Sequence, residues 1–253
     1  MKILVIPDAQ VKPGIDKIHL ECIGKYIVDK LPDVIVNIGD FADMSSLSSH
    51  DKPGSKSMEG KRYKADIDAT LEAMRVLLKP LRDYQNKLKA HKKKPYKPRM
   101  ILTLGNHEDR IRRAIDNDPK LDGLISVDDL NYDKDWEVIP FLQPIIIEGV
   151  AFCHYFISGV MGRPVTSARA LLTKHHMSCI AGHQQGKDIA YGKRGDGTGM
   201  TAIIAGSCYT HDEEYLNYQS NNHWRGIYLL HNVRNGQFDE CSVPIHYLLE
   251  KYK

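Results

Sequence analysis

Three short runs of apolar and β-branched residues constrain the fold of this chain most strongly. They lie at residues 2–6, 34–38 and 100–104. A strand that is apolar along its whole length is typical of a parallel sheet buried on both faces. The sequence therefore predicts an α/β fold whose first half alternates strands with helices.

Two helices are predicted between these strands. In residues 18–27 the apolar side chains share one face, and Leu31-Pro32 is expected to end that helix. In residues 67–88 an apolar stripe recurs every three or four positions, and Pro80 is expected to kink or interrupt the helix. We interpret the stripe as core packing rather than as a surface that binds a partner.

The second half of the chain is predicted to be rich in strands, with turns at Gly149 and at Asn235-Gly236 and one helix near residues 166–176. The expected strands are residues 143–148, 150–156, 178–181, 201–206, 226–231 and 238–243. Because the two halves join without a linker, we expect one α/β domain over residues 1–253, built on two sheets.

The composition agrees with a soluble globular protein, since 42% of the residues are hydrophobic and 26% are charged. No apolar run approaches the roughly 20 residues of a membrane helix. The first residues are interpreted as a strand rather than a signal peptide. The five cysteines are odd in number and far apart, which favours reduced thiols and a cytoplasmic location.

Polar residues follow each of the three buried strands. Asp8 follows the first, Asp40 and Asp43 the second, and Asn106 and His107 the third. The carboxyl ends of parallel strands converge on one crevice, where ligands bind. His154 and His183 have similar settings in the second half, so the sequence predicts a site for one or two divalent cations. Taken singly, each aspartate could be a helix cap and each histidine a core residue.

The ordered series resembles the calcineurin-like metallophosphoesterase superfamily, whose pattern is D-x-H, G-D-x-x-D, G-N-H-E/D, a lone His and G-H-x-H. The matching segments are Asp8-Ala9-Gln10, Gly39-Asp40-Phe41-Ala42-Asp43, Gly105-Asn106-His107-Glu108, His154 and Gly182-His183-Gln184-Gln185. Glutamine replaces histidine in the first and last. The resemblance implies a four-layer α/β/β/α sandwich of two mixed sheets flanked by helices, with the metal site at the sheet edges.

The resemblance also assigns roles to residues. Two divalent cations would share Asp40; one would be completed by Asn106, His154 and His183, the other by Asp8, Gln10 and Gln185. His107 would approach the scissile phosphate and protonate the leaving oxygen or stabilise charge, with Asp43 close behind it. A metal-activated hydroxide would attack phosphorus in line.

The two glutamines bear on the identity of the metal. An amide oxygen is a harder and weaker ligand than imidazole, so the site is expected to favour Mn²⁺, with Mg²⁺ next and Zn²⁺ least. Two alternatives remain open: the position next to the glutamines could be filled only transiently, or the site could be a relic without catalytic activity.

The substrate is predicted less directly. Met44-Ser45 after Asp43 differs from the Arg-Gly of the protein phosphatases in this superfamily. The chain looks more like phosphodiesterases or nucleases of bacteria and phages, so a phage-infected host is a second possible setting. Residues 87–99 hold seven Lys or Arg and no acid, while the whole chain has a net charge of +3.

We therefore expect a nuclease that binds nucleic acid, DNA more than RNA, through Lys92, Lys93, Lys94 and Arg110, and no membrane. The lysines could equally form a solvated loop, and Arg110 could pair with nearby acids. A small-molecule phosphatase or cyclic-nucleotide phosphodiesterase, and a nucleic-acid-binding protein with an inactive metal site, are the alternatives. Residues 211–225 are expected to form a loop near the site.

Overall fold

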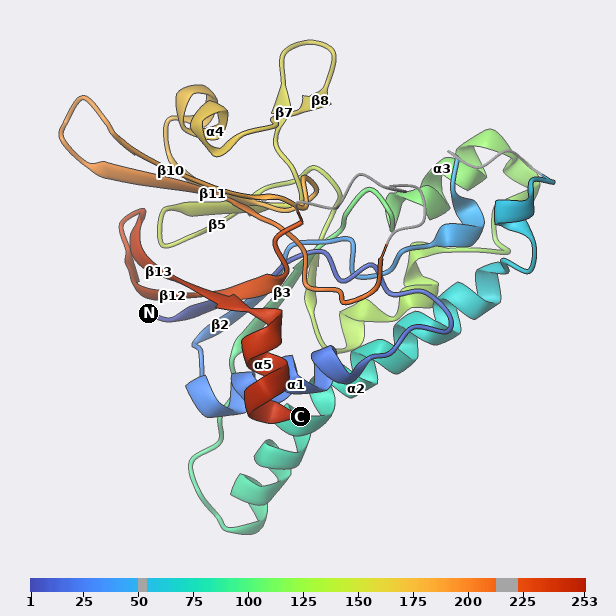
Figure 1. The fold of residues 1–253 in the computed structure, drawn as a ribbon, viewed down its shortest axis with the longest axis horizontal. Helices are drawn as coiled ribbons and strands as arrows, with labels where there is room; N and C mark the ends of the chain where they lie inside the picture. Colours follow the sequence, from blue (N-terminus) through green and yellow to red (C-terminus); the bar gives the residue numbers. More distant parts are fainter. Residues whose placement is uncertain (50–53, 213–222) are drawn as a thin grey trace.

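The computed structural model describes residues 1–49, 54–212 and 223–253. Two β-sheets lie face to face, with α1, α2 and α5 on the outer side of one sheet and α4 on the outer side of the other (Figure 1). The expected four-layer α/β/β/α sandwich is therefore confirmed. The expected loop at residues 211–225 falls largely on residues 213–222, which lie outside the described residues.

The first sheet contains the three strands predicted from the apolar runs. Its order is β13-β12-β1-β2-β3-β4, in which β1 to β4 are parallel and β12 and β13 join antiparallel to their neighbours. The strands are β1 (Ile3–Ile6), β2 (Val34–Asn37), β3 (Arg99–Thr103), β4 (Glu137–Ile139), β12 (Gly226–Arg234) and β13 (Gln237–Pro244).

The second sheet has the order β10-β11-β9-β6-β5 and is also mixed, because β6, β9 and β11 are parallel and both outer strands run against them. A small hairpin stands apart from both sheets. The strands are β5 (Ile145–Ile147), β6 (Val150–Cys153), β9 (Ser178–Ala181), β10 (Lys187–Lys193), β11 (Gly199–Ala205), and β7 (Ile157–Ser158) with β8 (Arg163–Pro164) in the hairpin.

Five α-helices and five short 3₁₀ turns complete the described residues. The helices are α1 (Ile18–Lys30), α2 (Tyr63–Ala90), α3 (Asp109–Asn117), α4 (Ala168–His175) and α5 (Ile245–Tyr252). The turns are Ser45–Leu47, Lys56–Met58, Pro119–Leu121, Val127–Leu130 and Tyr132–Lys134. No helix among the described residues is long and apolar enough to cross a membrane.

Burial on both faces explains why the early strands are apolar throughout. Along β1, Leu4 and Ile6 point into the core under the helices, whereas Ile3 and Val5 point into the core between the two sheets. The alternation is the ordinary period of two of a strand, and both sets of side chains are fully buried. A third cluster lies between the second sheet and α4.

Of the two outcomes expected at Pro80, a kink or an interruption, the interruption does not occur, because α2 runs through this residue as one helix. Proline has no backbone N–H, so α2 lacks one hydrogen bond at Pro80, and at the same point it packs tightly against α1. A Cβ atom on Gly24 would lie 2.3 Å from the carbonyl oxygen of Leu77 and 2.9 Å from the ring of Pro80. Glycine therefore lets the two helices touch where the proline disturbs the backbone.

His19 of α1 is a fully buried histidine for which the described residues offer neither ring nitrogen a hydrogen-bond partner. Burial, reinforced by His211 and opposed by Asp16, lowers the pKa of His19 from 6.5 to about 4. Below pH 6.5 the His19 side chain binds a proton in the unfolded chain, whereas in the folded protein it binds one only below about pH 4. The free energy of unfolding should therefore fall as the pH drops through this window.

We expect His19→Leu to remove this part of the pH dependence, which amounts to at most about 3 kcal/mol. Urea unfolding of both proteins at pH 7 and pH 4.5 measures it. The control is the exposed His246→Leu, which should follow the wild type. Equal losses of stability in the wild type and His19→Leu would contradict the prediction.

Candidate metal centre

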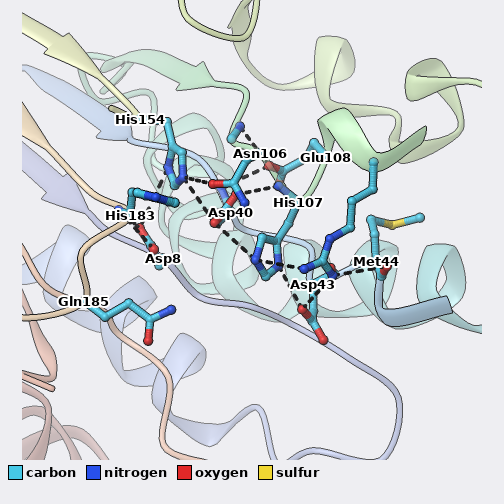
Figure 2. Close-up of polar contacts among 12 residues, drawn as sticks. Asp8, Asp40, Asp43, Met44, Asn106, His107, Glu108, His154, His183 and Gln185 are labelled. Atoms are coloured by element: carbon cyan, nitrogen blue, oxygen red, sulfur yellow. Dashed lines mark hydrogen bonds and ion pairs between the residues drawn. The ribbon is translucent and has the colours of Figure 1, made fainter. Parts of the chain in front are cut away.

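Five of the predicted ligands meet where strands of both sheets end (Figure 2). Asp8 follows β1, Asp40 follows β2 and Asn106 follows β3, while His154 and His183 follow β6 and β9 of the second sheet. Asp8, Asp40 and His154 are fully or almost fully buried. The face-to-face packing of the sheets thus brings together residues from distant parts of the sequence.

The backbone around these residues is unusually tight. Asp40 and His183 have φ values of 49° and 68°, in the left-handed region that most residues avoid. A Cβ atom at Gly105 would lie 2.1 Å from Asp40 Oδ1, and one at Gly182 would lie 2.4 Å from Asp8 Oδ1. Glycine is therefore required before Asn106 and before His183, since the carboxylates occupy the space of a side chain.

His154 has the geometry of a metal ligand. Its Nδ1 lies 2.9 Å from the carbonyl oxygen of Ile38, a contact in which the ring N–H donates. The other ring nitrogen, Nε2, lies 2.9 Å from Asn106 Oδ1 and 3.2 Å from Asp40 Oδ2. Histidine ligands commonly donate their second nitrogen to a carbonyl in this way, which directs the first at the metal.

The ligand atoms of Asp40, His154 and His183 all lie within 4.8 Å of one another. Together with Asn106 they offer two imidazoles, a carboxylate and an amide oxygen, a donor set that suits a divalent transition metal. The residues present therefore fit one cation at this place. Figure 2 shows the four side chains pointing toward one another.

The pKa values of these groups reflect their burial and their mutual charges. Burial tends to raise the pKa of Asp40, but the positive charges of His107 and His154 outweigh it and hold the value below the ordinary range. Burial tends to lower the pKa of His154, but Asp40 and Asp8 raise it to about 9. Burial and the charge of His154 lower the pKa of His183 to about 4. This ring is therefore uncharged at neutral pH and can offer a nitrogen lone pair to a metal.

Asp8 lies beside this group. Both of its carboxylate oxygens lie 3.2 Å from the backbone nitrogen of His183, and Oδ1 lies 4.0 Å from His154 Nδ1. Burial raises the pKa of Asp8 to about 7, and Asp40 adds to the shift while His154 opposes it. The assignment of Asp8 to a second metal stays a prediction.

The two glutamines are placed differently. Gln10 is buried, and its backbone N–H donates to the carbonyl oxygen of Asp40 at 2.8 Å. Gln185 is also buried, and its Oε1 accepts a hydrogen bond from the hydroxyl of Tyr209 at 2.5 Å. In Figure 2 no dashed line joins Gln185 to the other residues drawn. Metal ligation by either glutamine stays a prediction.

His107, Asp43 and Arg110 form a connected group next to Asp40. His107 Nδ1 lies 2.8 Å from Asp43 Oδ1, and its Nε2 lies 3.7 Å from Asp40 Oδ2. Arg110 donates to the carbonyl oxygen of Asp43 at 2.7 Å, and its second terminal nitrogen lies 3.2 Å from His107 Nε2. The guanidinium is largely buried and holds Asp43 and His107 in place. A role of Arg110 in binding substrate stays a prediction.

Glu108 also belongs to the site, although no role is predicted for it from its place in the Gly-Asn-His-Glu motif. Its carboxylate is fully buried and accepts hydrogen bonds from the backbone nitrogens of Asp40, Ala42 and Gly105 at 2.9–3.0 Å. Tyr132 contacts the same carboxylate with its hydroxyl at 3.4 Å. The position of Glu108 directly after His107 was the signal that could have identified it.

Lys92, Lys93 and Lys94 are exposed, as expected, but they lie at the opposite end of the first sheet. They follow the carboxyl end of α2 and precede β3, whereas Asn106 and His107 follow β3. Figure 1 shows this connection at the foot of the molecule, below the sheets. A substrate held at the metal centre reaches these lysines only if it extends along the whole sheet.

Comparisons with known proteins do not assign a role to any individual residue of this chain. Neither the protein-family models nor the curated proteins give a match. Among solved structures the chain is similar to Yfce, a phosphoesterase from E. coli, with 12% sequence identity, coverage of 96% of this chain and 100% of that chain, and a TM-score of 0.41.

We expect Mn²⁺ titration of the metal-free protein by calorimetry to show one tight site that requires His183. In His183→Ala the affinity of this site should fall by more than the roughly 10–100-fold that the loss of a hydrogen-bonding neighbour costs, because a ligand is removed. Asp43→Asn is the control, since Asp43 contacts His107 rather than the ligand cluster. Equal losses in the two variants would contradict the assignment.

Proposed function

We propose that this chain is a metal-dependent phosphoesterase that hydrolyses phosphodiester bonds, with nucleic acid as its substrate class. The observation that supports the proposal most directly is the convergence of Asp40, His154 and His183 within 4.8 Å at a buried sheet edge. His107 lies beside this cluster and Asp43 behind His107. Metal ligands next to an oriented histidine are what hydrolysis of a phosphate ester needs.

A divalent cation bound here would supply positive charge for phosphate oxygens and a water of lowered pKa. Asp40, Asn106, His154 and His183 would hold the first cation, and Asp8 and Gln10 with Asp40 would hold the second, weaker one. Because most of these ligands are oxygens, we place Zn²⁺ last, and because two of them are imidazoles, we propose Mn²⁺ over Mg²⁺.

The chain's own contribution to the chemistry centres on His107. Its Nδ1–H donates to Asp43, so Nε2, which lies 3.2 Å from a terminal nitrogen of Arg110, is the nitrogen that can transfer a proton to the leaving oxygen. Burial and the charge of Arg110 tend to lower the pKa of His107, but the charge of Asp40 and the hydrogen bond to Asp43 raise it above its ordinary value. The fraction of His107 that carries a proton at neutral pH is therefore increased, as suits a general acid.

A small phosphate ester is the second candidate substrate, and the position of the lysine-rich segment favours it. Lys92 to Lys94 lie at the end of the sheet opposite to the metal centre, so they cannot contact a small substrate there. Near the centre, Arg113 is half-exposed and donates to the carbonyl oxygen of Asn106, but it also pairs with Asp109.

The deciding experiment incubates the metal-loaded protein with single-stranded DNA, duplex DNA, RNA, bis-p-nitrophenyl phosphate and p-nitrophenyl phosphate. Cleavage of a polynucleotide together with the diester supports the proposal. Turnover of the two nitrophenyl esters alone would favour the second candidate. Binding of DNA without turnover of any compound would leave a nucleic-acid-binding protein with an inactive metal site.

We expect His107→Ala to keep the metal content of the wild type while turnover of bis-p-nitrophenyl phosphate falls by about 10²–10⁴-fold, the scale of a lost general acid or charge stabiliser. Elemental analysis and initial rates measure the two quantities. The exposed His246→Ala is the matched control. Loss of the metal, or full activity, in His107→Ala would show that the role is wrong.

We expect Lys92→Gln, Lys93→Gln and Lys94→Gln together to weaken binding of long oligonucleotides, with the salt dependence reduced by up to about 0.9 per lost phosphate contact. Hydrolysis of a small diester should not change. Oligonucleotides too short to span the roughly 16 Å of β3 should also bind as before.

The control for this triple variant replaces three other exposed lysines, Lys120, Lys134 and Lys193. Fluorescence anisotropy at several salt concentrations measures both variants. An unchanged salt slope in the first variant would assign residues 92–94 to a solvated loop without a substrate role.

A further inference from the structure

Gln185 is held by a chain of hydrogen bonds that leads away from the metal ligands. Its Oε1 accepts from the hydroxyl of Tyr209 at 2.5 Å, and the same hydroxyl lies 2.8 Å from His223 Nδ1. Because the hydroxyl gives its one proton to Gln185, His223 has to donate to the hydroxyl oxygen. The carbonyl oxygen is the atom of a glutamine side chain that ligates metals, and here it already accepts a strong hydrogen bond.

The rest of Gln185 is also fixed. Its backbone has a φ of 53°, and its carbonyl oxygen accepts from the backbone nitrogen of Trp224 at 3.2 Å. Tyr209 is fully buried and Gln185 is 9% exposed, so neither side chain can turn without disturbing its neighbours. The amide group is therefore held in one orientation by two segments, the one after β11 and the one before β12.

The orientation leaves the amide nitrogen as the group that Gln185 presents. In Figure 2 the nitrogen is turned toward the side on which Asp40 and His107 lie, and the oxygen points downward, away from both. An amide NH₂ offers two hydrogen-bond donors and no lone pair for a metal. The oxygens of a phosphate ester are acceptors, so this group is complementary to the substrate rather than to a cation.

We propose that Gln185 binds a phosphate oxygen of the substrate through its amide NH₂, and that Tyr209 and His223 position it for this purpose. The inference rests on the proposed function and deepens it by naming a substrate-binding residue. It gives Gln185 a role other than the metal ligation implied by the motif. Of the motif residues, Asp8 and Gln10 then remain with Asp40 for the second cation, which explains why that cation should be held weakly.

The test separates metal binding from substrate binding. Gln185→Met keeps the length of the side chain and removes both the oxygen and the nitrogen of the amide. We expect the Mn²⁺ affinities, measured by calorimetry without substrate, to equal those of the wild type. The inhibition constant for inorganic phosphate and the KM for bis-p-nitrophenyl phosphate should each rise by roughly 10–100-fold, the effect of one hydrogen bond to a charged group. The kcat should change much less.

Tyr209→Phe tests the positioning role, because it removes the hydroxyl and keeps the ring. We expect the same pattern with a smaller rise in KM, unchanged Mn²⁺ binding and an unchanged kcat. Tyr26→Phe is the matched control, because Tyr26 is also buried but lies on α1, and it should leave all of these quantities unchanged. If Tyr209→Phe does not fold, as judged by circular dichroism, Gln185→Met carries the test by itself.

Failure of the inference can be distinguished from failure of the proposed function. Weaker Mn²⁺ binding in Gln185→Met would overturn the inference and make Gln185 a metal ligand, and unchanged phosphate inhibition would overturn it as well; both leave the phosphoesterase proposal standing. A wild-type protein that neither binds Mn²⁺ nor hydrolyses any phosphate ester would overturn the proposed function and the inference with it.

Discussion

The buried carboxylate of Glu108 is the interaction on which the geometry of the metal centre depends. It accepts hydrogen bonds from the backbone N–H groups of Asp40 and Ala42, in the turn after β2, and from that of Gly105, in the turn after β3. Burial and the charge of Asp40 raise the pKa of Glu108, and the backbone N–H groups of Ala42 and Gly105 oppose the shift. Three hydrogen bonds to one carboxylate tie two strand ends together, and they hold Asp40 in a left-handed conformation that it would otherwise avoid.

The second constraint is the contact between the two sheets. Asp40 and Asn106 come from the first sheet, His154 and His183 from the second, and the hydrogen bond from His154 to Ile38 joins the two. The apolar core between the sheets therefore sets the distance between the halves of the candidate ligand set. Close-packed cores deform little, so the spacing of the candidate ligands follows from packing far from the site itself.

The sequence predicted those parts that depend on local pattern. The apolar runs identified β1 to β3, and the polar residues after them correctly indicated where side chains converge. It could not predict β10, a half-exposed edge strand with a weak pattern, or the eight-residue α5. The contact of Tyr209 with Gln185 depends on how β11 and β9 pair, which neither composition nor spacing reveals. The separation of Lys92–Lys94 from the centre, in contrast, follows from the order of the sequence, because these lysines precede the predicted strand that His107 follows.

Charge balance favours a cation at this place. Asp8 and Asp40 are two carboxylates buried side by side, and the described residues set the charges of His107 and His154 against their negative charge at close range. Asp40 takes most of this compensation, since its pKa is lowered, whereas the pKa of Asp8 rises to about 7. Buried charge without a partner is costly. A divalent cation between Asp40, Asn106 and the two histidines would replace the proton of His154 and leave both carboxylates ionised, which the protein groups alone achieve only in part.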